Sequence, residues 1–190
     1  LYRDGQVRWF LGIIVATTTV LSLFLITQHG MAVPDSFMNA SFNVVSLMTG
    51  TGFTNHDYNG WGGFGMSMLL FLMVVGGCAG STTCGIKIFR FQVLYAVTVS
   101  QLKKLLYPHG VFIPHFDGRP VPQDAAFSVM SFFFMYALCF AALAISLSFI
   151  GLDFTTSISG AVTAISNVGP GMGDIIGPTG TFAPLPDSAK

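Results

Sequence analysis

Two short stretches that contain glycine have the composition to bind a cation through backbone carbonyl oxygens. They are Thr49–Gly50–Thr51–Gly52–Phe53 and Ser166–Asn167–Val168–Gly169–Pro170. A cation that crosses a membrane must exchange its water for other oxygens, and carbonyls supply them where the chain is extended and fixed. Glycine is needed because successive carbonyls point the same way only in conformations that a side chain disfavours. Each stretch alone would suit an ordinary extracellular turn, but the occurrence of two favours a pore.

A short apolar segment precedes each glycine stretch and would position it. Residues 35–49 and 153–166 are too short, and too rich in Ser, Thr and Asn, to cross a bilayer. Each has an aspartate at its start, Asp35 or Asp153, which suits the positive end of a helix dipole. We therefore predict two re-entrant half-helices, each followed by extended backbone. Such backbone is tolerated at membrane depth only where it is buried in protein or lines water.

The composition is that of a protein surrounded by lipid. Hydrophobic residues make up 52% of the 190 positions and charged residues only 8%, against about 25% in a soluble domain. Residues 9–27 and 125–152 contain no charged residue, and each is long enough to cross a hydrocarbon core of about 30 Å as a helix. The formal net charge is zero, so no basic surface indicates nucleic acid.

The cysteines and histidines show no spacing that is typical of a metal site. Cys78, Cys84 and Cys139 lie in apolar segments without a CxxC pair, so we expect buried small side chains instead of disulfides or ligands. The four histidines are isolated in loops or at the end of a span. We therefore expect no cofactor, and no metal other than a transported ion.

A third apolar stretch, from residue 60 to about residue 102, is too long for one simple span. Its middle, Gly76 to Gly85, has four glycines and three hydroxyl residues in ten positions, and these are poor helix formers. We predict two helical halves joined by a break. Close helix packing through the GxxxG pair Gly76 and Gly80 is the alternative reason for the glycines.

The chain contains an internal repeat with an offset of 117 positions. At this offset Gly52 meets Gly169 and Asp57 meets Asp174, and the first span meets the second. The repeated unit is a span, a half-helix, a glycine strand and a closing span. This predicts an all-α membrane protein with three parts: a pore repeat at 1–104, a cytoplasmic connector at 105–124, and a second repeat at 125–190 that lacks its closing helix.

Basic residues give the orientation. They lie before the first span and from the break through the connector, at Arg3, Arg8, Lys87, Arg90, Lys103, Lys104 and Arg119. The positive-inside rule then places residues 1–8 and 103–124 in the cytoplasm, so the glycine strands enter from the outer face. We expect Arg90 to reach the cytoplasmic surface, whereas Lys87 would face an inner vestibule.

The chain resembles the TrkH subunit of bacterial Trk potassium uptake systems, in the Trk/Ktr/HKT superfamily. The resemblance rests on TGTGF at 49–53, on GGCAGSTTCGIK at 76–87, which is highly specific, and on SNVGPG at 166–171. It covers nearly the whole chain, as the third of four repeats and most of the fourth. Two features depart from the family: Cys84 stands where glycine is frequent, and the last closing helix, with its basic residue facing the pore, is absent.

The resemblance implies a multi-pass potassium transporter of the bacterial inner membrane. It implies four repeats around one pore, a homodimer, a cytosolic nucleotide-binding TrkA ring, and glycine at the filter as the mark of K⁺. The predicted filter carbonyls belong to Thr49, Gly50, Thr51, Gly52, Ser166, Asn167, Val168 and Gly169. The predicted gating loop, which obstructs or opens the pore, comprises Gly76, Gly77, Gly80, Ser81, Thr82, Thr83, Gly85 and Lys87.

Two other functions are alternatives to transport. A polytopic membrane enzyme would need paired catalytic groups within its spans, but every aspartate here lies near a span end or in a loop, and glutamate is absent. A non-conducting membrane scaffold would not need glycine strands at the same point of two repeats. We therefore expect a transport protein and not an enzyme.

Overall fold

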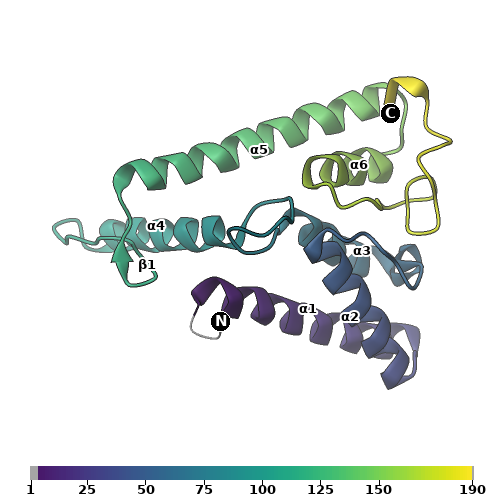
Figure 1. Cartoon of the computed structure of the whole chain (residues 1–190), viewed down its shortest axis with the longest axis horizontal. Helices are drawn as coiled ribbons and strands as arrows, with labels where there is room; N and C mark the ends of the chain where they lie inside the picture. The colour runs from purple at the N-terminus through teal and green to yellow at the C-terminus, as the bar shows by residue number, and fades with distance from the viewer. Residues whose placement is uncertain (1–3, 190) are drawn as a thin grey trace.

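The computed structural model describes residues 4–189 and is mostly helical (Figure 1). In this view α5 and α1 form the upper and lower edges, and α4 lies between them. The elements in chain order are α1 (Gly5–His29), α2 (Val33–Thr49), the 3₁₀ helix η1 (Tyr58–Trp61), α3 (Gly62–Val74), α4 (Ile88–Leu106), β1 (His115–Phe116), β2 (Arg119–Pro120), α5 (Gln123–Phe149), α6 (Phe154–Ser166) and the 3₁₀ helix η2 (Asp187–Ala189).

Two helices, α1 and α5, are long and apolar enough to cross a bilayer, judged by length and composition. They have 25 and 27 residues, and a rise of about 1.5 Å per residue makes each about 40 Å long. Helix α1 begins where the Asp4 carboxylate accepts a hydrogen bond from the Gln6 amide at 2.8 Å. It ends at Gly30, which has the left-handed conformation common after a helix. Both predicted uncharged spans therefore fall on long helices.

The third apolar stretch forms two helices, α3 and α4, separated by a non-helical segment at residues 75–87. Helix α3 has 13 residues and α4 has 19. The prediction of two helical halves joined by a break is confirmed. The break falls on the glycines and hydroxyl residues because these contribute least to helix stability.

Each glycine strand follows a short helix that packs on a long one. Helix α2 has 17 residues and lies against α1, and α6 has 13 residues and lies against α5 (Figure 1). Asp153 caps α6 by accepting a hydrogen bond from the Thr156 amide at 3.1 Å. Helix α2 begins at Val33, two residues before the predicted start, because Pro34 is well accommodated in a first helical turn.

The apolar core lies where α1, α2 and α3 meet. Its members are almost inaccessible to solvent and include Leu21, Leu25, Val44, Leu47, Leu69 and Leu72. Helix α5 differs, because Val129 is its one buried residue and its other side chains face outward at least in part. The prediction of buried thiols is therefore wrong for Cys139, which lies on α5, and for Cys84, which lies in the segment at 75–87; both are exposed.

The connector contains a short hairpin that was not predicted from the sequence. Strands β1 and β2 pair antiparallel, with His115 opposite Pro120 and Phe116 opposite Arg119. The turn between them is Asp117–Gly118, and both residues have positive φ angles, 50° and 74°. This dipeptide favours the tight hairpin turn in which both central residues are left-handed.

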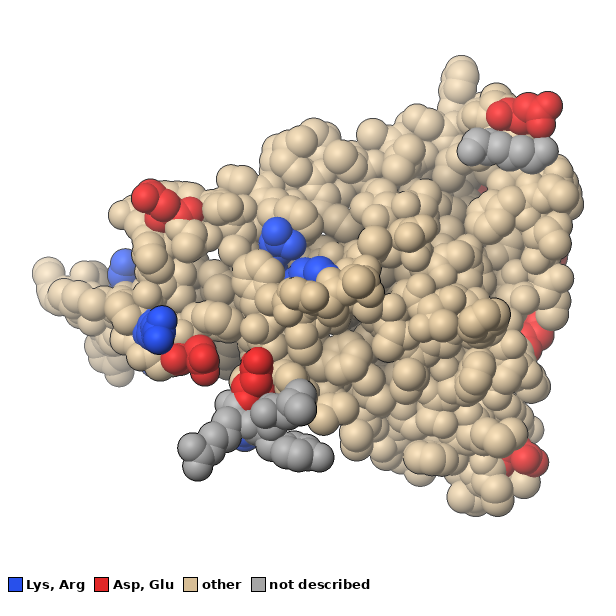
Figure 2. Space-filling model, viewed as in Figure 1, with Lys and Arg blue, Asp and Glu red and all other residues tan. Residues whose placement is uncertain are grey.

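Charged side chains are few on the molecular surface (Figure 2). On the face shown, Lys and Arg lie between the hairpin end and the middle of the molecule, and the charges visible at the opposite edge are acidic. Most of the remaining surface is uncharged, which suits contact with lipid or with other apolar protein segments.

Candidate ion-conduction site

The first glycine strand turns back along the end of its half-helix. Helix α2 ends at Thr49, and Gly50 follows in the left-handed conformation with φ 70°. The amide of Thr51 then donates a hydrogen bond to the Ser46 carbonyl at 3.0 Å, and the hydroxyls of Thr49 and Thr51 are 2.8 Å apart. Gly52 has a second positive φ of 76°. The strand therefore has a fixed backbone course directly after the half-helix.

The second glycine strand repeats this course. Helix α6 ends at Ser166, and Asn167 follows in the left-handed conformation with φ 49°. The amide of Val168 donates to the Thr163 carbonyl at 3.2 Å. This bond is equivalent to the one from the Thr51 amide to the Ser46 carbonyl in the first repeat. Gly169 has a φ of 110° and donates its amide to the Thr163 hydroxyl at 2.9 Å. Asparagine fits the first of these positions because it tolerates left-handed backbone better than most residues.

The two strands lie in contact, although 117 positions separate them in the sequence. A Cβ atom at Gly52 would overlap the Val168 carbonyl oxygen and would lie 3.1 Å from Cδ of Pro170. A Cβ atom at Gly50 would lie 3.8 Å from the Asn167 carbonyl oxygen. Gly52 is thus required both by its φ angle and by the lack of space for a side chain. The structure thus places Gly50 and Gly52 of the predicted filter close to Asn167, Val168 and Gly169 of the other strand.

An amide network behind the first strand was not predicted. Asn43, which is fully buried, donates through Nδ2 to the Asn55 side-chain oxygen at 2.8 Å. Asn55 donates in turn to the Asn39 side-chain oxygen at 3.0 Å. These bonds fix the backbone beyond the first strand to α2. The spacing of Asn39 and Asn43 by one helical turn was the available signal, because such a pair shares one face of a half-helix.

A single hydroxyl pair holds the start of the second strand. Tyr136 of α5 places its hydroxyl 2.9 Å from the Ser166 hydroxyl at the end of α6. This contact ties the long helix of the second repeat to the point where its half-helix gives way to the glycine strand. A tyrosine within an apolar span carries no signal in the sequence that distinguishes it from an interfacial aromatic residue.

The segment at 75–87 closes on itself. Its ends form a parallel bridge between Val75 and Ile86, in which the Gly76 amide donates to the Ile86 carbonyl at 2.9 Å. A Cβ atom at Gly76 would overlap the Cys84 carbonyl oxygen. Gly85 has a φ of 77°, and a Cβ atom there would lie 3.0 Å from a backbone carbonyl of α3. Glycine at both ends therefore permits the close approach of the two halves.

Side chains inside this segment hold it in one arrangement. The Gly77 amide donates to the Thr83 hydroxyl at 2.9 Å, and the Ser81 hydroxyl donates to the Cys78 carbonyl at 2.7 Å. The Lys87 ammonium donates to the Ser81 carbonyl at 2.7 Å and also to the Thr83 carbonyl. Lys87 thus binds the loop carbonyls from within, whereas Thr82 is exposed.

Gly80 does not behave as a helix-packing glycine. It has a φ of 81°, and a Cβ atom there would meet no atom within 4 Å among the described residues. This disfavours the GxxxG alternative for the break, because a packing glycine needs a neighbouring backbone.

The Arg90 guanidinium, which follows the segment, lies 3.8 Å from the centre of the Phe132 ring on α5. It packs there as a cation on an aromatic face.

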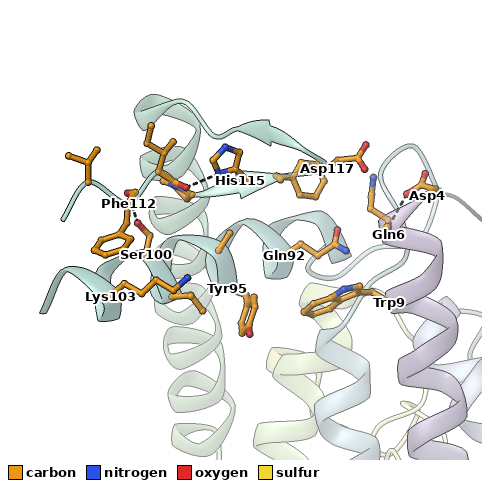
Figure 3. Close-up of a pocket in the computed structure, with 17 residues that line it drawn as sticks. Asp4, Gln6, Trp9, Gln92, Tyr95, Ser100, Lys103, Phe112, His115 and Asp117 are labelled. Atoms are coloured by element: carbon orange, nitrogen blue, oxygen red, sulfur yellow. Dashed lines mark hydrogen bonds between the residues drawn. The ribbon is translucent and has the colours of Figure 1, made fainter. Parts of the chain in front are cut away.

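One hollow, drawn in Figure 3, lies away from the glycine strands. It has a volume of about 570 Å³ and lies between the start of α1, helix α4 and the connector. Trp9, Tyr95 and His115 line it, together with Gln6, whose side-chain oxygen accepts a hydrogen bond from the Ala79 amide at 2.8 Å. The hollow contains none of the predicted filter residues. Among residues 4–189, no group of three or more His, Cys, Asp or Glu side chains is placed to hold a metal ion.

Long apolar helices, short helices packed on them and glycine strands that meet are typical of a helical membrane protein. A family model described as TrkH, cation transport protein, matches residues 1–190. The chain therefore belongs to the TrkH family of cation transport proteins. The predicted family is confirmed.

Curated relatives agree with this family. The Trk system potassium uptake protein TrkI of Halomonas elongata is 44% identical over 190 residues, which are all of this chain and 38% of the relative. The Trk system potassium uptake protein TrkH of Vibrio parahaemolyticus is 34% identical over 175 residues, 92% of this chain and 36% of the relative. The chain thus spans less than two-fifths of the length of either relative. Both are transport proteins and not enzymes.

A solved structure agrees with the fold. The crystal structure of the potassium transporter TrkH from Vibrio parahaemolyticus superposes with a TM-score of 0.89 and 34% sequence identity. The match covers 99% of this chain and 40% of that one. The predicted all-α membrane fold is confirmed.

Proposed function

We propose that this chain forms part of the pore of a Trk-type potassium uptake subunit, a multi-pass protein of the bacterial inner membrane. The observation that supports it most strongly is the matched pair of strands at 49–52 and 166–169. They have positive φ at equivalent positions and lie in contact. The names of the two relatives reported above, both Trk system potassium uptake proteins, support the same ion.

Backbone carbonyls of the two strands act as ligands of K⁺ in this proposal. The strands are held by half-helices whose C-terminal ends, at Thr49 and Ser166, stop where the strands begin. A helix C-terminus carries a partial negative charge equivalent to about half an electron, which stabilises a cation beside it. The arrangement thus offers a dehydrated cation both fixed oxygens and a favourable field.

The segment from Gly76 to Lys87 acts as the gate. Its unwound backbone must face protein or a water-filled path, because lipid does not satisfy free amides and carbonyls. Its arrangement depends on a few hydrogen bonds made by Ser81, Thr83 and Lys87. Such an arrangement can be shifted by a difference of a few kcal/mol between two states. A cytosolic nucleotide-binding ring of the TrkA type, and a second copy of the subunit, complete the proposed assembly.

The 190-residue chain by itself should not conduct. Two strands contribute ligands to only part of a ring around an ion, so the remaining oxygens must come from other repeats. The measurement is ⁸⁶Rb⁺ uptake into vesicles that contain the purified chain, beside vesicles that contain the full-length protein. We expect uptake only in the second sample. Potassium-selective uptake through the chain alone would contradict the proposed division of the pore among repeats.

A further inference from the structure

Four hydrogen bonds link the segment after the first glycine strand to the segment after the second. The Tyr58 hydroxyl donates to the Gly171 carbonyl at 3.0 Å. The Asn59 side chain donates to the Gly173 carbonyl at 3.1 Å and accepts from the Gly173 amide at 3.0 Å. The Thr54 hydroxyl donates a fourth hydrogen bond, to the Pro178 carbonyl at 3.3 Å. The two repeats are therefore joined outside the filter strands as well as along them.

Tyr58 is held rigidly on its own side of this contact. Its side chain is fully buried, and its ring packs edge-on against Trp61, with the ring centres 6.3 Å apart. Asp57 caps the 3₁₀ helix η1, because its carboxylate accepts a hydrogen bond from the Asn59 amide at 3.0 Å. The hydroxyl of the rigid, buried Tyr58 ring thus reaches the carbonyl of Gly171, two residues beyond Gly169.

Asn59 pairs with Gly173 as a neighbouring strand would. Its amide group supplies one donor and one acceptor to the amide and carbonyl of the same residue. A Cβ atom at Gly177 would overlap Nδ2 of Asn59, so glycine at that position leaves room for the pairing. From the other side, Ser159 of α6 accepts a hydrogen bond from the Met172 amide at 2.9 Å. Residues 171–173 are therefore fixed between α6 and η1.

The side chains that make this contact come from the first repeat, and the second repeat has no equivalent side chains. At the offset of 117 positions, Tyr58 and Asn59 meet Ile175 and Ile176, which have no polar group in their side chains. Ile176 instead accepts a backbone hydrogen bond from Gly171 at 2.6 Å, which closes a turn within its own repeat. The first repeat therefore positions the second through groups that the second repeat does not possess.

We propose that Tyr58 and Asn59 are positioning residues that set the distance between the two glycine strands and thereby the discrimination of K⁺ from Na⁺. This inference rests on the proposed potassium pore. Selectivity depends on the number and position of the carbonyl oxygens around the ion, and these oxygens come from strands on separate half-helices. Bonds between the two repeats limit how far the strands can approach a smaller ion or move away from a larger one.

The test measures reversal potentials of the full-length protein in planar bilayers with K⁺ on one side and Na⁺ on the other. Loss of one hydrogen bond at a buried carbonyl is worth about 1 kcal/mol, so Tyr58→Phe should lower the K⁺/Na⁺ permeability ratio about fivefold. Asn59→Ala removes two bonds and should lower it further. Tyr95→Phe is the matched control, because Tyr95 is an exposed tyrosine on α4, away from both strands.

A general structural role would reduce protein yield, thermal stability or open probability and leave the permeability ratio unchanged. The proposal therefore requires a lower ratio in Tyr58→Phe with an unchanged open probability. A wild-type ratio in folded Tyr58→Phe protein would overturn it, whatever the result for Asn59→Ala. A wild-type protein without K⁺ selectivity would instead contradict the proposed function, so the two failures can be told apart.

Discussion

Replacing Gly52 with serine in the full-length protein should lower the K⁺/Na⁺ permeability ratio by about tenfold or more. The Gly52 backbone has a φ of 76°, and a Cβ atom would overlap the Val168 carbonyl oxygen of the neighbouring strand. A side chain in left-handed backbone costs about 1–2 kcal/mol, and the overlap displaces a predicted ligand besides. A change of about 1.4 kcal/mol in relative ion binding corresponds to a factor of ten.

A second filter variant and a control variant allow that result to be interpreted. Gly169→Ser should also lower the ratio, but by less, because a Cβ atom there meets only the Gly52 Cα at 4.0 Å and the strain is confined to its own φ of 110°. Gly60→Ser is the matched control: Gly60 lies in η1, after the first strand, and a Cβ atom there meets no atom within 4 Å among the described residues. Unchanged selectivity in both Gly52→Ser and Gly169→Ser would remove these strands from the filter.

Changing Gly76 and Gly77 together to alanine should raise the open fraction at least about tenfold and leave the K⁺/Na⁺ ratio as it is. A Cβ atom at Gly76 would overlap the Cys84 carbonyl oxygen, and one at Gly77 would lie 2.6 Å from the Thr83 hydroxyl. The compact arrangement of the loop is therefore excluded, and alanine also favours helix over glycine by about 1 kcal/mol per residue. Single-channel recording of the full-length protein measures both quantities.

Gly63→Ala serves as the control for this pair. Gly63 lies in the first turn of α3, and a Cβ atom there meets no atom within 4 Å among the described residues. Its open fraction should equal that of the wild type. If the Gly76 and Gly77 variant showed altered selectivity with normal opening and closing, the segment would belong to the filter and not to the gate.

The features that the sequence predicted well are those that depend on local composition. Uncharged runs gave α1 and α5 because burial of an unpaired charge in lipid is costly. The glycine and hydroxyl residues at 76–85 gave the break between α3 and α4 because they oppose helix wherever they occur. The internal repeat carried more information than either strand alone. At its offset Asn167, which is not a glycine, aligns with Gly50, and the structure gives both residues left-handed backbone.

The features that it missed depend on contacts between distant residues. Tyr58 and Asn59 read in sequence as an ordinary loop, and their partners lie 113 and 114 positions away. No periodicity encodes a side chain that bonds to the backbone of another repeat. The repeat itself hid the contact, because alignment at 117 positions emphasises what the two copies share, whereas Tyr58 and Asn59 are present in one copy only. The hairpin was within reach, since Asp117–Gly118 is a strong turn signal.

The central claim is that the strands at 49–52 and 166–169 bind the transported ion. Anomalous scattering from crystals of the full-length protein grown in Rb⁺ tests it most directly, because Rb⁺ substitutes for K⁺ and is located without reference to flux. We expect anomalous peaks at coordinating distance from the carbonyl oxygens of both strands, and loss of those peaks in Gly52→Ser. Peaks confined to other parts of the protein, with none at these carbonyls, would contradict it.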